Sequence, residues 1–250
     1  MIKQENPFGV EIRFDPESHT FETDNVNDFV SVTTFISRFF EKFDKEAISK
    51  RVADRRGVPV QEILDDWEQK GIEGSQLGNN IHTYCENILL GKKPPKPIND
   101  KAKAMMESVD PILKAMKRKY LVKPEMIVFS EELKLAGIID VFATRKVSMK
   151  YFIFDWKTNN DLNKGERFAK PGFGPLRHIK GTTLNKYALQ LNMYEFILKH
   201  EKYIESYMEV EKGIIHITTD GVKEYSVLNL QREVSDMIKF GLNHYEEPYG

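Results

Sequence analysis

Three charged residues stand at the ends of two strongly apolar stretches of the sequence. Asp140 ends the run GIID (137–140), and Asp155 and Lys157 come directly after YFIF (151–154). Residues i and i+2 of a strand point to the same face, so Asp155 and Lys157 project together while Trp156 faces the other way. Burying a charge is costly unless something offsets its desolvation, so these residues need a chemical or structural reason to be there.

If the two stretches form neighbouring strands, two carboxylates and an ammonium group meet at one point. Carboxylates that converge in a low dielectric repel each other unless a divalent cation lies between them. Oxygen ligands suit Mg²⁺ or Mn²⁺, which commonly bind through one or two carboxylates together with phosphates and water. A lysine beside such an ion can orient a water molecule or stabilise charge developing on a phosphate. The residues therefore predict a phosphodiester-hydrolysing site; the simpler alternative is a strand-end ion pair between Asp155 and Lys157.

The spacing of an acidic residue two positions before a lysine is not specific by itself. It occurs at Glu68–Lys70, Glu132–Lys134 and Asp155–Lys157. The first lies in a helical pattern and the second in a polar segment, so both predict surface pairs. Glu132 shares the strand parity of Asp140, but a bend at the intervening glycine would break that parity, and Glu132 is not counted among the site residues.

Two further pairs of polar residues are spaced by one helical turn. His82 and Glu86 share a helix face beside an apolar stripe, and Gln190 and Tyr194 do the same in a later segment. Without other motifs, His82 and Tyr194 are more typical of a packed core than of a binding site.

The composition limits the class of protein. The chain has 250 residues, of which 40% are hydrophobic and 30% charged, with a net charge of −1 and one cysteine, Cys85. One cysteine excludes a disulfide framework and a four-cysteine metal site. No apolar stretch approaches the roughly 20 residues that cross a bilayer, and the N-terminus lacks a signal-peptide pattern. We expect a soluble, cytoplasmic protein with no membrane partner.

Hydrophobic periodicity predicts the elements that must position these residues. Residues 10–23 predict a hairpin, and helical spacing recurs near 31–43, 44–56, 60–70, 77–90 and 100–120. Two strands are predicted within 126–145, a third at 151–158, a helix at 183–200, strands at 213–219 and 223–230, and a last helix at 230–245. This order predicts a single α/β domain (1–250), with a hairpin and helical part (1–120) followed by a catalytic α/β core (121–250).

Four motifs occur in an order that resembles the PD-(D/E)xK nuclease superfamily, specifically its RecB-like exonuclease branch. They are GNNIHTYCENILLGKKP (78–94), GIID (137–140), DWK (155–157) and QLNMY (190–194). SVTTFISRF (31–39) and LRHIKGTTLNKYALQLNMYEF (176–196) are also similar to phage-type members and to the mitochondrial genome-maintenance exonuclease. The chain lacks the four cysteines of iron–sulfur members and the Walker A motif of a helicase motor.

The resemblance implies a restriction-endonuclease-like fold, with a central mixed β-sheet flanked by helices and an N-terminal helical elaboration. It also implies a role for each candidate residue. The implied metal ligands are His82, Asp140, Asp155 and the Trp156 carbonyl. The implied catalytic residues are Lys157, Asp155 and Asp140. The implied contacts to the DNA backbone are Gln190 and Tyr194, and Glu86 would support His82.

The implied activity is that of a Mg²⁺- or Mn²⁺-dependent DNA nuclease. It would act as an exonuclease on single-stranded ends in replication, recombination or repair, with a helicase, polymerase or recombinase as a protein partner. Two alternatives stay open: a non-catalytic DNA-binding or scaffold protein with the same fold, and a structure- or sequence-specific endonuclease. The segment 159–182 is irregular and carries Lys164, Arg167, Lys170 and Arg177, and we expect it to form a mobile flap over the substrate.

Overall fold

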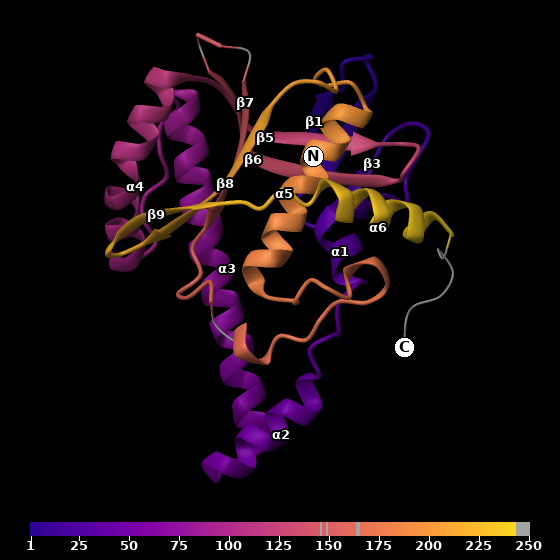
Figure 1. Ribbon diagram of the computed structural model, residues 1–250. Helices are drawn as coiled ribbons and strands as arrows, with labels where there is room; N and C mark the ends of the chain where they lie inside the picture. The colour runs from indigo at the N-terminus through magenta and orange to yellow at the C-terminus, as the bar shows by residue number, and fades with distance from the viewer. Residues whose placement is uncertain (146, 149, 164–165, 244–250) are drawn as a thin grey trace.

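A mixed six-stranded sheet forms the centre of the computed structural model, which describes residues 1–145, 147–148, 150–163 and 166–243 (Figure 1). Its strands are β4 (Val30–Ser31), β5 (Tyr120–Ser130), β6 (Leu135–Arg145), β7 (Tyr151–Lys157), β8 (Val210–Thr218) and β9 (Gly221–Ser226). The order is β4-β6-β7-β8-β9, and β5 pairs with β6 outside this path. β4 runs parallel to β6 and β7 parallel to β8, whereas the other pairs are antiparallel. The stretches that carry Asp140 and Asp155 are therefore neighbouring strands, as the site prediction requires.

Helices cover both faces of this sheet (Figure 1). The helices of the described residues are α1 (Val32–Ser37), α2 (Lys45–Arg56), α3 (Val60–Leu90), α4 (Asp100–Lys119), α5 (Thr183–His200) and α6 (Gln231–Asn243), of which α2 lies away from the sheet. α1, α5 and α6 pack on one face around Ile139 and Ile153, and α3 and α4 pack on the other around Val141 and Trp156. The predicted α/β class, with a mixed sheet flanked by helices, is confirmed. None of the described helices is both long and apolar enough to cross a membrane.

A small antiparallel sheet precedes the helices. It consists of β1 (Ile2–Glu5), β2 (Glu11–Asp15) and β3 (Thr20–Glu22). β2 and β3 form the predicted hairpin, and their Ile12 and Phe14 pack against Ile127 and Phe129 of β5. β1 lies outside the prediction because its sequence IKQE has no apolar alternation.

The first helix is shorter than its apolar spacing predicts. The pattern over 31–43 predicts one amphipathic helix, but α1 ends at Ser37. Phe39 and Phe40 are nevertheless buried. The Phe39 carbonyl accepts the Phe173 N–H at 2.7 Å, so this backbone group bonds a distant segment rather than the next helical turn. The apolar residues up to Phe40 thus report burial correctly, whereas Phe43 is 65% exposed and the helix is shorter than the pattern predicts.

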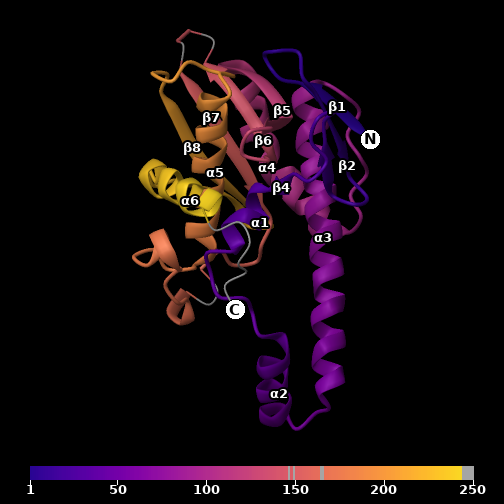
Figure 2. The same cartoon turned by 90° about the vertical axis from the view of Figure 1, so that its right-hand side faces the viewer.

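α3 is a single helix of 31 residues where the pattern predicts two. Glycines 71, 74 and 78 each weaken a helix by about 1 kcal/mol, which is why the pattern indicates a break. Packing at both ends outweighs that cost: Ile63 is buried in the part that pairs with α2, and Ile81 is buried beside the sheet. We call α2 and the first part of α3 (residues 45–76) the arm, and Figure 2 shows it extending away from the sheet.

The irregular segment 159–182 is anchored to the rest of the molecule. It contains two short 3₁₀ turns, η1 (Glu166–Phe168) and η2 (Gly174–Leu176). Leu176 is fully buried, and the hydrogen bond from Phe173 to Phe39 ties the segment to the residues that follow α1. The described part of the predicted flap therefore has a fixed base. Lys164, which belongs to that prediction, lies outside the described residues.

Candidate metal centre

The candidate site lies where β6 and β7 separate. Their antiparallel ladder runs from Thr144↔Tyr151 to Val141↔Phe154 and ends there. Beyond it, β6 continues beside β5 while β7 continues beside β8, so the sheet forks (Figure 1). Asp140 is the first residue of β6 past the ladder, and its Oδ2 accepts the backbone N–H of Trp156 at 2.7 Å. One carboxylate oxygen thus replaces a backbone acceptor across the fork.

Side-chain alternation breaks at the same point of the sheet. Ile139 packs with α1, α5 and α6, whereas Val141, two residues further on, packs with α3 and α4. Glu125 of β5 and Asp140 of β6 both lie between the pairs Pro124↔Val141 and Met126↔Ile139, where the ladder is interrupted. The φ of Glu125 is +48°, in the left-handed region that residues other than glycine avoid. Among the described non-glycine residues with positive φ, Glu125 alone lies within a strand. Both strands are therefore distorted where the two carboxylates face each other.

Three side chains from three elements bring potential metal-ligand atoms together. His82 of α3, Glu125 of β5 and Asp140 of β6 each offer one such atom, and these atoms all lie within 4.8 Å of one another. We call these three residues the donor cluster. Donors on one ion with bonds of about 2.1 Å lie at most about 4.2 Å apart, so binding requires only a small closure of the cluster. Two carboxylates and an imidazole are donors that suit a divalent cation such as Mg²⁺ or Mn²⁺.

The surroundings of His82 set the orientation of its ring. Its Nε2 lies 3.2 Å from the Trp156 carbonyl, and its Nδ1 lies 3.6 Å from Asp140 Oδ1. With the proton on Nε2, the ring donates to that carbonyl and presents the Nδ1 lone pair to the carboxylates, an arrangement typical of ligating histidines. The Trp156 carbonyl, expected as a further ligand, thus contacts His82, and its binding to a metal stays a prediction.

Asp155 and Lys157 form an ion pair beside this cluster. Lys157 Nζ lies 2.7 Å from Asp155 Oδ2 and 4.2 Å from the centre of the Tyr187 ring. Within the described residues Asp155 Oδ2 accepts no hydrogen bond of regular geometry, so the ammonium group compensates it by charge. Asp155 stands outside the group of three donor atoms, and its role as a metal ligand stays a prediction.

The protonation of this pair follows from burial and charge. Burial raises the pKa of Asp155 to about 6, against the opposing effect of Lys157. Burial by itself would lower the pKa of Lys157, but the carboxylates of Asp155 and Asp140 outweigh it and raise that pKa. At neutral pH the lysine is therefore an ammonium ion, which can donate hydrogen bonds but cannot accept a proton.

Gln190 and Tyr194 lie beneath the fork, on α5. Gln190 Nε2 donates to Tyr194 Oη at 3.0 Å, and the two residues are 8% and 3% exposed. A Cβ atom at position 137 would lie 2.5 Å from Tyr194 Cε1, so only glycine lets β6 pass this close to the ring. Tyr194 thus packs against β6 at Gly137, and the charges of Asp155 and Asp140 reach its hydroxyl. The contact of Gln190 and Tyr194 with DNA stays a prediction.

Glu125 is the member of the donor cluster that the sequence-based candidates do not include. It stands directly before the apolar run MIVF (126–129), in the same kind of position as the aspartates of the two later strands. A carboxylate at the edge of an apolar run is the signal that could have identified it. Glu132, in contrast, has a side chain that is 75% exposed and lies 3.3 Å from His200, away from the donor cluster.

The pKa of Glu125 predicts how the metal-free protein responds to pH. Burial, followed by the charges of Asp140, Glu86 and Asp155, raises this pKa from 4.5 to about 8. A carboxyl whose pKa is higher in the folded state stabilises the fold while protonated and loses that contribution as the pH rises. We expect stability to fall between about pH 4.5 and about pH 8, by at most about 1.4 kcal/mol per pH unit for one proton.

Unfolding of the metal-free protein at a series of pH values checks this expectation. Glu125→Gln should flatten the dependence, and saturating Mn²⁺ should flatten or reverse it because the cation displaces the proton. Glu132→Gln is the matched control, since that exposed glutamate should leave the wild-type dependence unchanged. The same slope in wild type and Glu125→Gln would contradict the buried titration.

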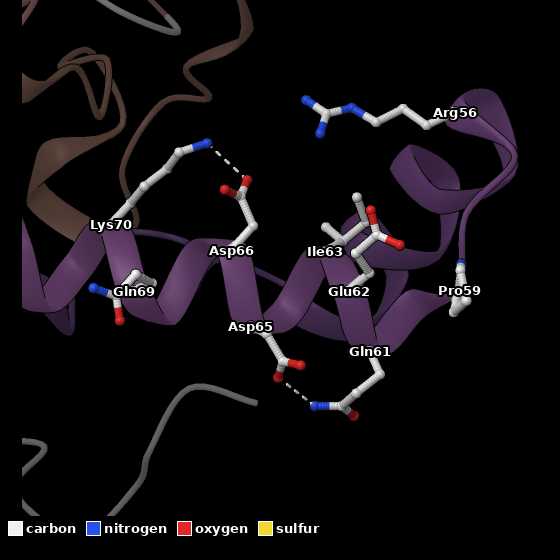
Figure 3. Close-up of a pocket in the computed structure, with 9 residues that line it drawn as sticks. All are labelled: Arg56, Pro59, Gln61, Glu62, Ile63, Asp65, Asp66, Gln69 and Lys70. Atoms are coloured by element: carbon white, nitrogen blue, oxygen red, sulfur yellow. Dashed lines mark hydrogen bonds and ion pairs between the residues drawn. The ribbon is translucent and has the colours of Figure 1, made fainter.

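A second hollow lies at the far end of the arm, between the end of α2 and the start of α3 (Figure 3). Asp66 and Lys70 form an ion pair at 2.7 Å along the exposed helix surface, and Gln61 donates to Asp65 at 2.7 Å. Asp66 precedes His82 by 16 residues on the same helix, which is roughly 24 Å along its axis. This hollow is therefore separate from the donor cluster, and its exposed charges indicate ordinary solvated surface.

Comparisons with models of protein families and with curated proteins find no match. The geometry of the fork is therefore the basis for the function proposed below.

Proposed function

We propose that this chain is a Mg²⁺- or Mn²⁺-dependent DNA nuclease with a restriction-endonuclease-like core, acting as an exonuclease on single-stranded ends. One observation carries the proposal. The donor atoms of His82, Glu125 and Asp140 converge at the fork of the sheet, directly beside the Asp155–Lys157 ion pair. This combination of a cation site and an adjacent fixed ammonium group matches what phosphodiester hydrolysis requires.

The donor cluster fits a divalent cation on electrostatic grounds. Burial raises the pKa values of Glu125 and Asp155, and repulsion from the Asp140 carboxylate raises both further. A bound divalent ion would offset this repulsion, polarise a phosphate oxygen and lower the pKa of a coordinated water. Candidate ligands are His82 Nδ1 and one oxygen each from Glu125 and Asp140.

Lys157 supplies the second part of the proposed chemistry. Its ammonium group is held by Asp155 and by the Tyr187 ring, and its side chain is 16% exposed. A cation fixed in this way can donate a hydrogen bond to the attacking water or to the phosphate oxygens. Negative charge builds up on those oxygens while phosphorus forms its bond to the water and breaks its bond to the bridging oxygen. A protonated lysine does not act as the base, so its proposed role is electrostatic.

Two basic surfaces support binding to a nucleic-acid backbone. α2 in the arm carries five basic and two acidic residues. The segment 159–182 presents Arg167, Lys170 and Arg177, all exposed, on the chain that leaves the end of β7. Such groups bind phosphates without reading sequence. The sequence has no Walker A motif, so a separate helicase, polymerase or recombinase would supply single-stranded ends.

Neutralising this segment should weaken DNA binding. A variant with glutamine at Arg167, Lys170 and Arg177 should bind single-stranded DNA less tightly, with a salt dependence whose slope falls by about 0.7 for each phosphate group that is no longer neutralised. Fluorescence anisotropy over a range of salt concentrations measures both quantities. The matched control replaces Lys103, Lys114 and Arg118, three exposed residues of α4 on the opposite face of the sheet. Equal slopes in the two variants would identify the segment as solvated surface.

A digest of linear and circular single strands tests the proposed function directly. End-labelled linear DNA should be degraded with Mg²⁺ or Mn²⁺, chelator should stop the reaction, and the circular strand should persist. Cleavage of the circle would identify an endonuclease instead. Binding without cleavage in either metal would leave the non-catalytic DNA-binding alternative and overturn the enzymatic proposal.

A further inference from the structure

Gln4 of β1 contacts the distorted part of β5 from a position 121 residues earlier in the chain. Its Nε2 donates to the Glu125 carbonyl at 2.7 Å, and its Oε1 accepts the Ile127 N–H at 3.0 Å. β5 pairs with β6 along its other edge, so these two backbone groups lie on the edge that no strand of the main sheet covers. The side-chain amide of Gln4 offers one donor and one acceptor, as a neighbouring backbone would.

Gln4 contacts the member of the donor cluster whose backbone is strained, Glu125. Glu125 has a φ of +48°, which a residue with a Cβ keeps only where its surroundings hold it. The two hydrogen bonds fix the orientation of the Glu125 carbonyl and of the Ile127 N–H that follows it. They therefore fix the backbone conformation at Glu125. That conformation sets the direction of the Glu125 side chain, which approaches His82 and Asp140.

The position of Gln4 in the small sheet makes the contact specific. Gln4 pairs with Ile12 of β2, whose side chain is fully buried against β5. The small sheet thus places the amide at one point of the β5 edge. In the same strand, Lys3 forms an ion pair with Glu11 at 2.8 Å, within the small sheet.

We propose that Gln4 is a positioning residue for the metal centre: it holds Glu125 in its left-handed conformation so that the carboxylate reaches the cation. This inference rests on the proposed function, because it assumes that Glu125 is a ligand. It assigns the N-terminal strand a part in building the site. Gln4 itself touches neither the cation nor the substrate.

Calorimetric titration with Mn²⁺ tests the inference on the full chain. Gln4→Met keeps the length of the side chain and removes both hydrogen bonds, and it should weaken Mn²⁺ binding by about tenfold or more, as the removal of supporting partners around metal sites does. Lys3→Met is the matched control, since it breaks an ion pair of the same strand without touching β5, and it should bind Mn²⁺ as wild type does. Wild-type affinity in Gln4→Met would overturn the inference.

A double-mutant cycle separates positioning from a general loss of structure. If Gln4 acts through Glu125, Gln4→Met should cost affinity in wild type and almost none in the Glu125→Gln background. An equal loss in both backgrounds would show that Gln4 only stabilises the fold, and would overturn the positioning role. The Glu125→Gln variant alone tests the metal centre: wild-type Mn²⁺ affinity there would contradict the proposed function itself, whatever Gln4 does.

Discussion

Asp140→Asn is expected to abolish measurable DNA cleavage and to weaken Mn²⁺ binding strongly. Asp140 Oδ2 accepts the Trp156 N–H at 2.7 Å, so the amide oxygen of asparagine can keep this bond. The amide nitrogen then faces His82 and Glu125, in the place of the oxygen that would bind the cation. A neutral amide group is a poor ligand for a hard cation, and its nitrogen is no ligand at all.

The thermal stability of Asp140→Asn shows whether the loss of cleavage comes from the missing ligand or from a folding defect. Because the substitution removes one of several converging carboxylates, metal-free Asp140→Asn should melt at the wild-type temperature or above it. Single-turnover cleavage, Mn²⁺ calorimetry and thermal melts on the same preparation measure the three properties. Asp220→Asn, at an exposed position of the turn between β8 and β9, is the control and should change none of them. An Asp140→Asn protein that binds Mn²⁺ with wild-type affinity would contradict the assignment of this ligand.

Lys157→Ala is expected to lose about 10²-fold or more in the rate of cleavage while keeping its metal. The ammonium group acts on charge that develops in the transition state, so its loss affects chemistry more than ground-state binding. Mn²⁺ affinity should survive or rise, because a cation beside the metal has been removed. DNA affinity should change little, since one lysine among many phosphate contacts contributes modestly.

The competing explanation is that Lys157 only compensates Asp155. The pair is largely buried, and breaking such a pair costs roughly 3–5 kcal/mol of stability. Lys212→Ala provides the comparison, because Lys212 forms a similarly buried ion pair with Glu195 and stands opposite Ile153, not Asp155, in the register of β7 and β8. Both variants should melt earlier, but only Lys157→Ala should be slow in single-turnover kinetics of the folded protein. Normal cleavage by folded Lys157→Ala would show that the lysine is purely structural.

The sequence predicts much of this fold because its signals are local. Apolar runs report strands that are shielded from water, and β6, β7 and α5 occur where the pattern indicates. The same signals identify Asp140, Asp155 and Lys157, because a charge at the edge of an apolar run is visible without any knowledge of its neighbours. The antiparallel pairing of β6 with β7, which the sequence analysis left as a condition, then brings Asp140 to Trp156.

Tertiary contacts decide the lengths of α1 and α3 and the burial of side chains on α5, which local sequence patterns do not predict. The single helix α3 exists because packing at its two ends outweighs three helix-weakening glycines, and α1 stops where a distant segment takes the Phe39 carbonyl. Burial of Gln190 and Tyr194 depends on the missing side chain of Gly137, which lies on another element.

The composition of the donor cluster is the clearest such case. Glu125 joins His82 and Asp140 because β5 pairs along β6 and because its backbone turns to a left-handed φ at one residue. That conformation has no signature in the residues around position 125. Gln4, 121 residues before Glu125, donates to the Glu125 carbonyl and accepts the Ile127 N–H, and a pattern of local burial and periodicity carries no information about contacts of that kind. The sequence alone therefore determined which strands carry charge, and only the folded chain decided which of those charges meet.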